Sequence, residues 1–274
     1  MQQSTITLNN GVVMPQLGFG VFQVPDAETT AAVSTALTAG YRSIDTAAAY
    51  RNEKGVGIAL AESDIKREEL FITTKLWNSD QGYDETLRAF DRSVGALGLD
   101  AVDLYLIHWP APANDKYLDT WRAFERIQAD GRARAIGVSN FQPEHLRRLI
   151  DNSDVVPAVN QIELHPFLVQ EELRAFDAEH GIATEAWSPL AKGGELLGNP
   201  TVTAIADRLA RTPAQVVLRW HLQLGNVVIP KSVTPSRIAE NLNVFDFELT
   251  TDDVAALTAL DKGLRTGPHP DTFN

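Results

Sequence analysis

The sequence contains no cysteine among its 274 residues. Without thiols the chain cannot form disulfides, bind zinc through thiolates or use a cysteine nucleophile. It also lacks any apolar run near the roughly 18 residues that mark a membrane-spanning helix. Met1–Leu8 is polar and alternating, without the basic end and apolar stretch of a signal peptide. We therefore expect a cytoplasmic protein with no membrane partner.

Positive charge is scarce, because 24 Lys and Arg stand against 36 Asp and Glu, for a formal net charge of −12. Such an acidic surface repels nucleic-acid phosphates and anionic lipids, so we expect neither as a partner. A local cluster of cationic side chains could still bind a small anion. The 44% of hydrophobic and 22% of charged residues exclude a disordered or collagen-like chain. No apolar stripe suggests an interface between subunits, which favours a monomer.

Short apolar runs alternate with amphipathic segments along most of the chain. Met1–Pro15 is predicted to form a hairpin around the Asn9-Asn10-Gly11 turn. The predicted strands are Leu17–Gly20, Ser43–Asp45, Leu70–Lys75, Val102–His108, Ala133–Ser139, Ala158–Glu163, Ala183–Ser188 and Val227–Pro230. The predicted helices are Ala27–Ala39, Glu53–Glu62, Glu85–Leu97, Tyr117–Asp130, Glu144–Asn152, Glu171–His180, Pro213–Leu224 and Ser236–Val244.

Eight such strand–helix units without a Pro/Gly/Ser-rich linker predict an α/β fold, a single (β/α)8 TIM barrel domain over residues 1–274. The hairpin would precede the barrel, and a short C-terminal tail would follow it. A doubly wound sheet is the alternative, but it usually carries a glycine-rich first turn. The nearest such sequence, Gly55-Val56-Gly57, lacks the third glycine and does not follow a strand.

Polar side chains stand at the carboxyl ends of seven of the eight predicted strands. In a barrel these positions converge on one mouth, which is where barrel enzymes carry out their chemistry. In chain order they are Asp45, Lys75, His108, Ser139 with Asn140, Gln161, Ser188 and Lys231. We therefore predict a functional site at this mouth.

Tyr50 lies on the loop after the second strand and supplies a candidate proton donor. A phenol has a pKa of about 10, and a nearby ammonium such as Lys75, held by Asp45, would lower it toward neutral pH. His108 could donate a hydrogen bond that orients a carbonyl oxygen. A proton donor with no nucleophile and no metal suits carbonyl reduction by hydride from a bound cofactor. The alternative from these residues is a Schiff-base lyase with Lys75 as nucleophile.

The segment after the last strand predicts an anion site. Ile229–Arg237 runs from the strand into a helix N-terminus and carries two cations and three hydroxyls. Three aromatic residues after strand ends, Phe22, Trp77 and Trp109, are predicted to form an apolar cup over the mouth. Glu163 and His165 could suggest a metal pair, but no third ligand has zinc spacing. His145, His180, His221 and His269 are interpreted as surface histidines.

Three segments resemble the signatures of aldo-keto reductases. They are Gly40–Ala47 with Tyr50, Asn52, Glu53 and Gly57; Gly137–Phe141; and Ile229–Ser232 with Arg237, Glu240 and Asn241. Their order along the chain also agrees with the family. Within the family, Ala186–Leu190 and the tail at Gly267–Asp271 look most like the bacterial 2,5-diketo-D-gluconate reductase branch.

The resemblance implies NADPH-dependent reduction of small aldehydes, dicarbonyls or keto-sugars. Tyr50 would be the general acid, tuned by Lys75 and Asp45, and His108 would orient the carbonyl. Residues implied in binding NADPH or NADP+ are Gly20, Ser139, Asn140, Gln161, Trp187, Ser188, Leu190, Lys231, Ser232, Val233, Thr234, Arg237, Glu240 and Asn241. Phe22, Trp77, Trp109 and His108 would contact the substrate. The family's longer animal tails line the pocket, so this short tail implies an open, permissive pocket. A barrel that binds NADPH as a sensor, with little turnover, is the alternative.

Overall fold

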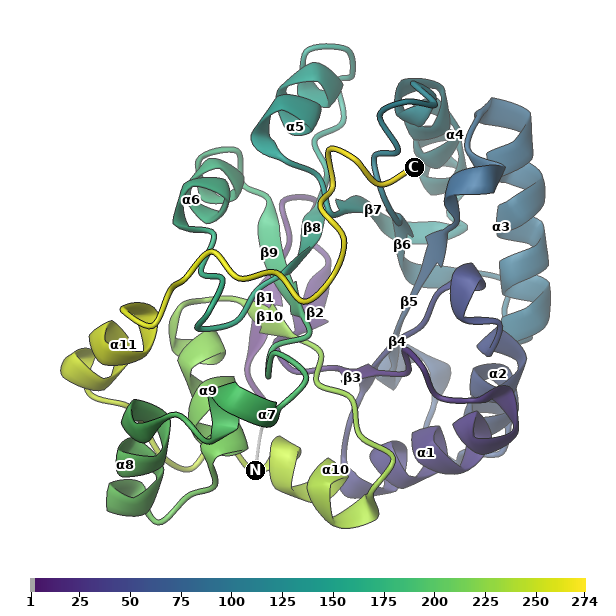
Figure 1. The fold of residues 1–274 in the computed structure, drawn as a ribbon. Coiled ribbons are helices and arrows are strands. Elements are labelled where there is room, and N and C mark those ends of the chain that lie inside the picture. The colour runs from purple at the N-terminus through teal and green to yellow at the C-terminus, as the bar shows by residue number, and fades with distance from the viewer. Residues whose placement is uncertain (1–2) are drawn as a thin grey trace.

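The computed structural model describes residues 3–274, so the first two residues of the predicted hairpin lie outside the described part. Parallel strands curl around a common axis, with helices on the outside (Figure 1). The strands are β3 (Phe19–Gly20), β4 (Ser43–Asp45), β5 (Phe71–Leu76), β6 (Val102–Ile107), β7 (Ala133–Ser139), β8 (Val159–Glu163), β9 (Ala183–Trp187) and β10 (Val227–Val228). Each pairs in parallel with the next along the chain.

The sheet closes on itself between its last and first strands. Leu17, just before β3, forms a parallel bridge with Val228 of β10. The Gly18 N–H donates to the Val228 carbonyl at 2.9 Å, and the Val228 N–H donates to the Gln16 carbonyl at 3.0 Å. The predicted (β/α)8 barrel is therefore confirmed, and the doubly wound alternative is wrong.

All eight predicted helices are present, with ends that differ by one or two residues. They are α1 (Asp26–Ala39), α2 (Glu53–Ala61), α3 (Tyr83–Leu97), α4 (Tyr117–Ala129), α5 (Pro143–Ile150), α6 (Glu171–Glu179), α9 (Pro213–Gln223) and α10 (Pro235–Leu242). The prediction missed α7 (Gly194–Leu197), α8 (Pro200–Leu209) and α11 (Thr251–Thr258). Two of these helices begin at capping residues that can be recognised in the sequence. The Asn199 side chain caps α8 at the Thr201 N–H, and Thr250 and Asp253 form a capping box on α11.

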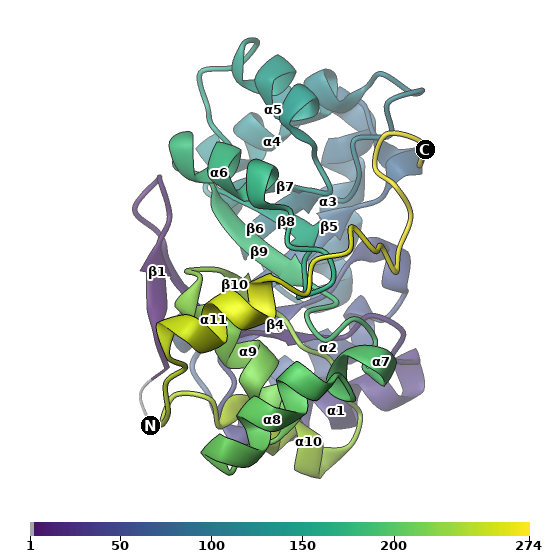
Figure 2. The ribbon, with the colours of Figure 1, turned by 60° about the vertical axis from the view of Figure 1, so that its left-hand side comes forward.

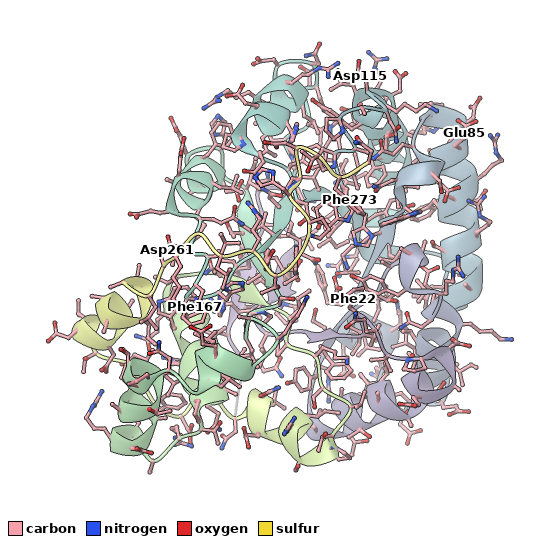
Figure 3. All side chains as sticks on the ribbon, viewed as in Figure 1. Phe22, Glu85, Asp115, Phe167, Asp261 and Phe273 are labelled. Atoms are coloured by element: carbon pink, nitrogen blue, oxygen red, sulfur yellow. The ribbon has the colours of Figure 1, made fainter. Side chains whose placement is uncertain are left out.

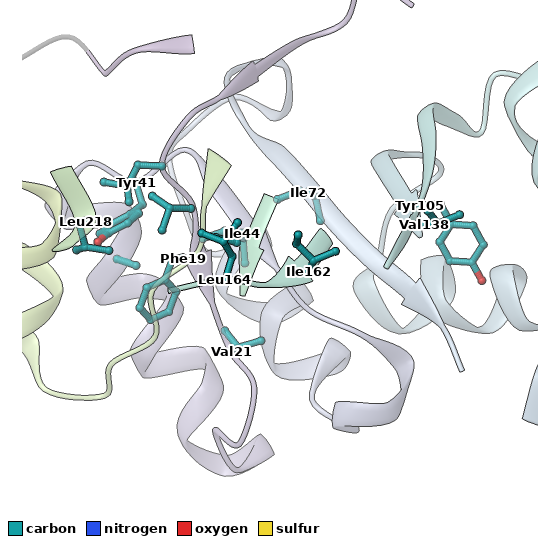
Figure 4. Close-up of a cluster of buried hydrophobic side chains, with 14 of the residues drawn as sticks. Phe19, Val21, Tyr41, Ile44, Ile72, Tyr105, Val138, Ile162, Leu164 and Leu218 are labelled. Atoms are coloured by element: carbon teal, nitrogen blue, oxygen red, sulfur yellow. The ribbon is translucent and has the colours of Figure 1, made fainter. Parts of the chain in front are cut away.

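The predicted hairpin pairs β1 (Thr5–Thr7) antiparallel to β2 (Val13–Pro15). Leu8 and Met14 of this hairpin are buried in one apolar cluster with interior side chains of the barrel, including Leu104 and Val159. A larger cluster fills the space between strands and helices, and Figure 4 shows part of it, with Phe19, Tyr41 and Ile44 labelled. The hairpin therefore adds to the apolar packing inside the barrel.

The tail crosses the mouth of the barrel after α11 and ends beyond it (Figure 2).

One histidine prediction is wrong, because His221 is completely buried on α9 with its Nε2 3.2 Å from the Pro189 carbonyl oxygen. Burial lowers the pKa of His221 to about 3, so the ring stays neutral. Among the described residues, none of the helices has the length and apolar character needed to cross a membrane.

Candidate active site

A cleft of about 1220 Å³ opens at the carboxyl ends of the strands, where the sequence predicted a site. Its lining includes most of the predicted site residues: Gly20, Phe22, Asp45, Tyr50, Trp77, His108, Trp109, Ser139, Asn140, Gln161, Trp187, Ser188, Leu190, Lys231, Ser232, Arg237, Glu240 and Asn241. Lys75 is fully buried and does not line the cleft, and neither do Val233 and Thr234. One opening thus joins the proton-donor candidates to the predicted anion site.

Lys75, near the end of β5, forms a buried ion pair with Asp45 at the end of β4. The Lys75 ammonium lies 2.6 Å from Asp45 Oδ1 and also donates to the Thr46 carbonyl at 2.9 Å. Burial opposes the charged amine, but attraction to Asp45, Tyr50 and Glu185 and the hydrogen bond to Asp45 together raise the pKa of Lys75. A protonated amine is not a nucleophile, so this geometry does not favour the Schiff-base lyase.

Tyr50 ends a short 3-10 helix (Ala48–Tyr50) after β4, and Arg51 follows in the left-handed region with φ of 57°. Its ring packs against Phe22 and His108, with ring centres 5.0 Å and 5.6 Å away. The Lys75 ammonium lies 5.1 Å from the centre of the Tyr50 ring. Burial raises the pKa of the Tyr50 phenol, and the Lys75 charge opposes that rise. The hydroxyl therefore keeps its proton at neutral pH beside a cation that stabilises the phenolate.

His108 follows β6 and faces the same part of the cleft. Burial, together with the Lys75 charge, holds the pKa of His108 well below its ordinary value, so the ring is neutral at pH 7. Its Nδ1 is buried without a partner among the described residues, which leaves Nε2 as the nitrogen available to the cleft. A neutral imidazole can donate one hydrogen bond to a carbonyl oxygen without competing for the proton of Tyr50.

Amide and hydroxyl groups from β7 and β8 form the next part of the wall. The Ser139 hydroxyl donates to the Gln161 carbonyl at 2.8 Å, and the Asn140 amide donates to the His108 carbonyl at 2.9 Å. Asn140 has a positive φ of 63°, a conformation that asparagine tolerates better than most residues. These bonds fix a polar wall directly beside Tyr50 and His108.

Trp187, at the end of β9, supplies an aromatic face to this wall. Its indole N–H donates to Asn140 Oδ1 at 2.8 Å, which holds the ring in one orientation. The fixed indole, the amide of Gln161 and the nearby polar wall fit a planar aromatic ring that carries a carboxamide, as nicotinamide does.

The far end of the cleft is cationic. Lys231 and Arg237 line it, with Ser232 between them, next to the N-terminus of α10, which begins at Pro235. Free N–H groups and the helix dipole at such a terminus favour an anion. The residues present therefore fit a dinucleotide phosphate, with Glu240 and Asn241 of α10 lining the same end.

The C-terminal tail also lines the cleft, which the sequence did not predict. Thr266, Gly267, Pro268 and Phe273 line the cleft, although the tail is short. Phe273 packs against Trp109, with ring centres 4.6 Å apart, and against Trp77 at 6.2 Å. Phe22 and Phe273 are labelled in Figure 3 and approach the mouth from different segments. The tail thus adds a fourth aromatic residue, Phe273, to the predicted cup.

Glu163, at the end of β8, anchors the tail. Its buried carboxylate accepts hydrogen bonds from the Thr266 N–H at 2.5 Å, the Thr266 hydroxyl at 2.6 Å and the Gly267 N–H at 3.2 Å. His165 Nε2 lies 3.2 Å from the same carboxylate. Within residues 3–274 no group of three or more His, Asp or Glu side chains could hold a metal ion. The Glu163–His165 pair therefore serves the tail.

Comparison with known proteins gives consistent matches over nearly the whole chain. The model of the Aldo/keto reductase family matches residues 16–262. An aldo-keto reductase of Mycolicibacterium smegmatis is 60% identical over 98% of both chains, and methylglyoxal reductase DkgA of Escherichia coli is 53% identical over 98% of both. A crystal structure of a Gox0644 mutant in complex with NADPH aligns with this chain over 100% of both chains, with 50% identity and a TM-score of 0.96. The family predicted from the sequence is confirmed, and this chain belongs to the aldo/keto reductase family.

Proposed function

We propose that this enzyme reduces small aldehydes, dicarbonyls and keto-sugars to alcohols with NADPH, and that Tyr50 donates the proton. The observation that carries the proposal is a half-buried phenol that opens into the cleft beside the Lys75–Asp45 ion pair. The relative from Escherichia coli, named a methylglyoxal reductase, supports a small dicarbonyl as substrate.

Each residue has a distinct part in the proposed reaction. His108 donates a hydrogen bond to the carbonyl oxygen and sets its position next to the Tyr50 hydroxyl. Tyr50 gives its proton to that oxygen as negative charge develops there, and Lys75 stabilises the resulting phenolate. Asp45 keeps the Lys75 ammonium in place. Bound NADPH supplies the hydride.

The two ends of the cleft would hold different parts of NADPH. Ser139, Asn140, Gln161 and Trp187 would hold the nicotinamide, and Lys231, Ser232 and Arg237 would hold the 2′-phosphate. The remaining residues proposed to contact the cofactor are Gly20, Ser188, Leu190, Glu240 and Asn241, which line the cleft, and Val233 and Thr234, which lie outside its lining between Ser232 and α10. Phe22, Trp77 and Trp109 would contact the substrate. The cationic end supports a preference for NADPH over NADH.

The test is NADPH consumption with methylglyoxal, phenylglyoxal and a diketo-gluconate, measured for the native enzyme and Tyr50→Phe. Loss of a general acid typically slows turnover on the order of 10²–10⁴-fold. Most of the activity surviving in Tyr50→Phe would remove Tyr50 from the reaction. Tight NADPH binding without turnover of any carbonyl would favour a sensor.

The 2′-phosphate assignment has its own test. Arg237→Ala is expected to weaken NADPH binding much more than NADH binding, because only NADPH carries that phosphate. Equal losses for the two nucleotides would show that this end of the cleft does not recognise the phosphate.

We also propose that the chain acts in the cytoplasm as a monomer, as one barrel domain, without nucleic-acid or membrane partners. Its net charge of −12 and lack of cysteine support this view. The large apolar side chains exposed among residues 3–274 are Val13, Phe22, Ile58, Tyr83, Val233 and Leu264. Light scattering should give a mass near 30.0 kDa, and a mass near twice that value would contradict the monomer.

A further inference from the structure

Glu185 is a carboxyl in the centre of the barrel that the proposed reaction does not use. It lies in the middle of β9, opposite Gln161 of β8 and Val227 of β10, and is completely buried. A buried carboxyl costs free energy unless its hydrogen bonds compensate, so its presence beside the site needs a physical reason. That reason lies in its contact with Gln161.

Both amide hydrogens of Gln161 are engaged below the cleft. Gln161 Nε2 donates to Glu185 Oε2 at 2.9 Å and to Asp45 Oδ2 at 2.8 Å. Asp45 is held in turn by Lys75. Both side-chain hydrogen bonds of Gln161 to the described residues are donated by Nε2, which leaves Oε1 as its acceptor, and Gln161 lines the cleft. The amide therefore offers the cleft an acceptor and no donor.

The two carboxyl groups together dictate this orientation. A rotation of the Gln161 amide by half a turn would place its carbonyl oxygen against the Asp45 carboxylate and break the amide's hydrogen bonds to both Asp45 and Glu185. Asp45 alone leaves one amide hydrogen without a partner, so Glu185 completes the arrangement. We propose that Glu185 is a positioning residue, which holds the Gln161 carbonyl oxygen toward the cleft to accept a hydrogen bond from the carboxamide NH₂ of bound nicotinamide.

The charge state of Glu185 is consistent with this role. Burial and repulsion by Asp45 raise the pKa of Glu185 to about 8, so the carboxyl is mostly protonated at neutral pH. The proton has a place on Oε1, which is buried without a partner among the described residues. Oε2 can then accept from Gln161 without a second full negative charge beside Asp45.

The inference rests on the proposed function, because NADPH is taken as the ligand of the cleft. Its test is the dissociation constant of NADPH, measured by nucleotide fluorescence for the native enzyme, Glu185→Leu and Glu185→Gln. Leucine has no acceptor, and we expect binding to weaken roughly tenfold, as loss of one buried hydrogen bond does. Glutamine can accept through its own oxygen and should restore affinity to within about threefold.

A double variant separates positioning from general damage to the barrel. Once Gln161→Ala has removed the amide, adding Glu185→Leu should not weaken NADPH binding further, because the two side chains act as one unit. Asp177 is a matched control, since it is another fully buried carboxyl that accepts from an amide, Asn160, and does not line the cleft. Asp177→Leu should lower stability and leave NADPH affinity unchanged.

Several results would overturn the inference. Native affinity in folded Glu185→Leu, or no rescue by Glu185→Gln, would show that the hydrogen bond to Gln161 does not position the amide. A measurement on the unaltered protein avoids any folding defect of a variant: the side-chain amide protons of Gln161 should exchange slowly with solvent, and fast exchange contradicts the proposal. A native protein that neither binds NADPH nor reduces carbonyls would instead refute the proposed function.

Discussion

Gly267 of the tail lies so close to Trp187 that a single methyl group should disturb the cleft. A Cβ at this position would sit 2.5 Å from Trp187 Cη2 and 3.3 Å from Cζ3, so one of the two segments must move. The indole is held by its bond to Asn140, and the Gly267 N–H is held by Glu163. Either movement therefore strains or breaks a hydrogen bond.

Three contributions set the size of the effect of Gly267→Ala. Overpacking typically costs about 1–3 kcal/mol, and a lost hydrogen bond about 1 kcal/mol. The alanine recovers about 0.5–1 kcal/mol by restricting the unfolded chain. Together these contributions lower the stability of the folded enzyme by roughly 1–3.5 kcal/mol. NADPH affinity falls only by the part needed to return Trp187 to its native position, and roughly 1–2 kcal/mol there corresponds to a loss of about 5- to 30-fold.

The assay is NADPH titration by fluorescence, with Gly95→Ala of α3 as the matched control. A Cβ at Gly95 meets nothing within 4 Å, so that variant should bind NADPH normally and gain a few tenths to about 1 kcal/mol in stability. NADPH affinity in Gly267→Ala equal to that of Gly95→Ala would refute the reasoning that the tail positions Trp187.

Two further predictions concern buried carboxyl groups away from the cleft. Burial raises the pKa of Asp177 to about 7, above its ordinary value, so the folded state loses stability as pH rises from about 4 through 7. Asp177→Asn should therefore raise the melting temperature more at pH 8 than at pH 5, and an equal change at both pH values would contradict this. Asp103 accepts from the Ile72 N–H and pairs with Arg67 and Arg134. Asp103→Ala should cost about 2–4 kcal/mol in urea unfolding, whereas Asp119→Ala, from an exposed pair, should cost under about 1 kcal/mol.

Much of the fold followed from local pattern. Each barrel strand is a short apolar run and each covering helix has a 3.6-residue period, so both kinds of element could be predicted with ends correct to one or two residues. Two of the helices that the pattern did not predict show why it failed there. The helices α8 and α11 follow clear capping residues, Asn199 and Thr250, but neither belongs to a strand–helix unit, which is why they were missed.

The sequence by itself determined which residues stand at the carboxyl ends of the strands, and barrel geometry then brings Asp45, Lys75 and His108 to one mouth. Only the tertiary structure decided which of these groups touch. Three contacts join segments far apart in the chain. They are the ion pair of Lys75 with Asp45, the hydrogen bonds of Glu163 to the tail at Thr266, and the hydrogen bond between Gln161 and Glu185. Such contacts depend on the stagger of neighbouring strands and on the path of the tail, and no periodicity within a single segment encodes either.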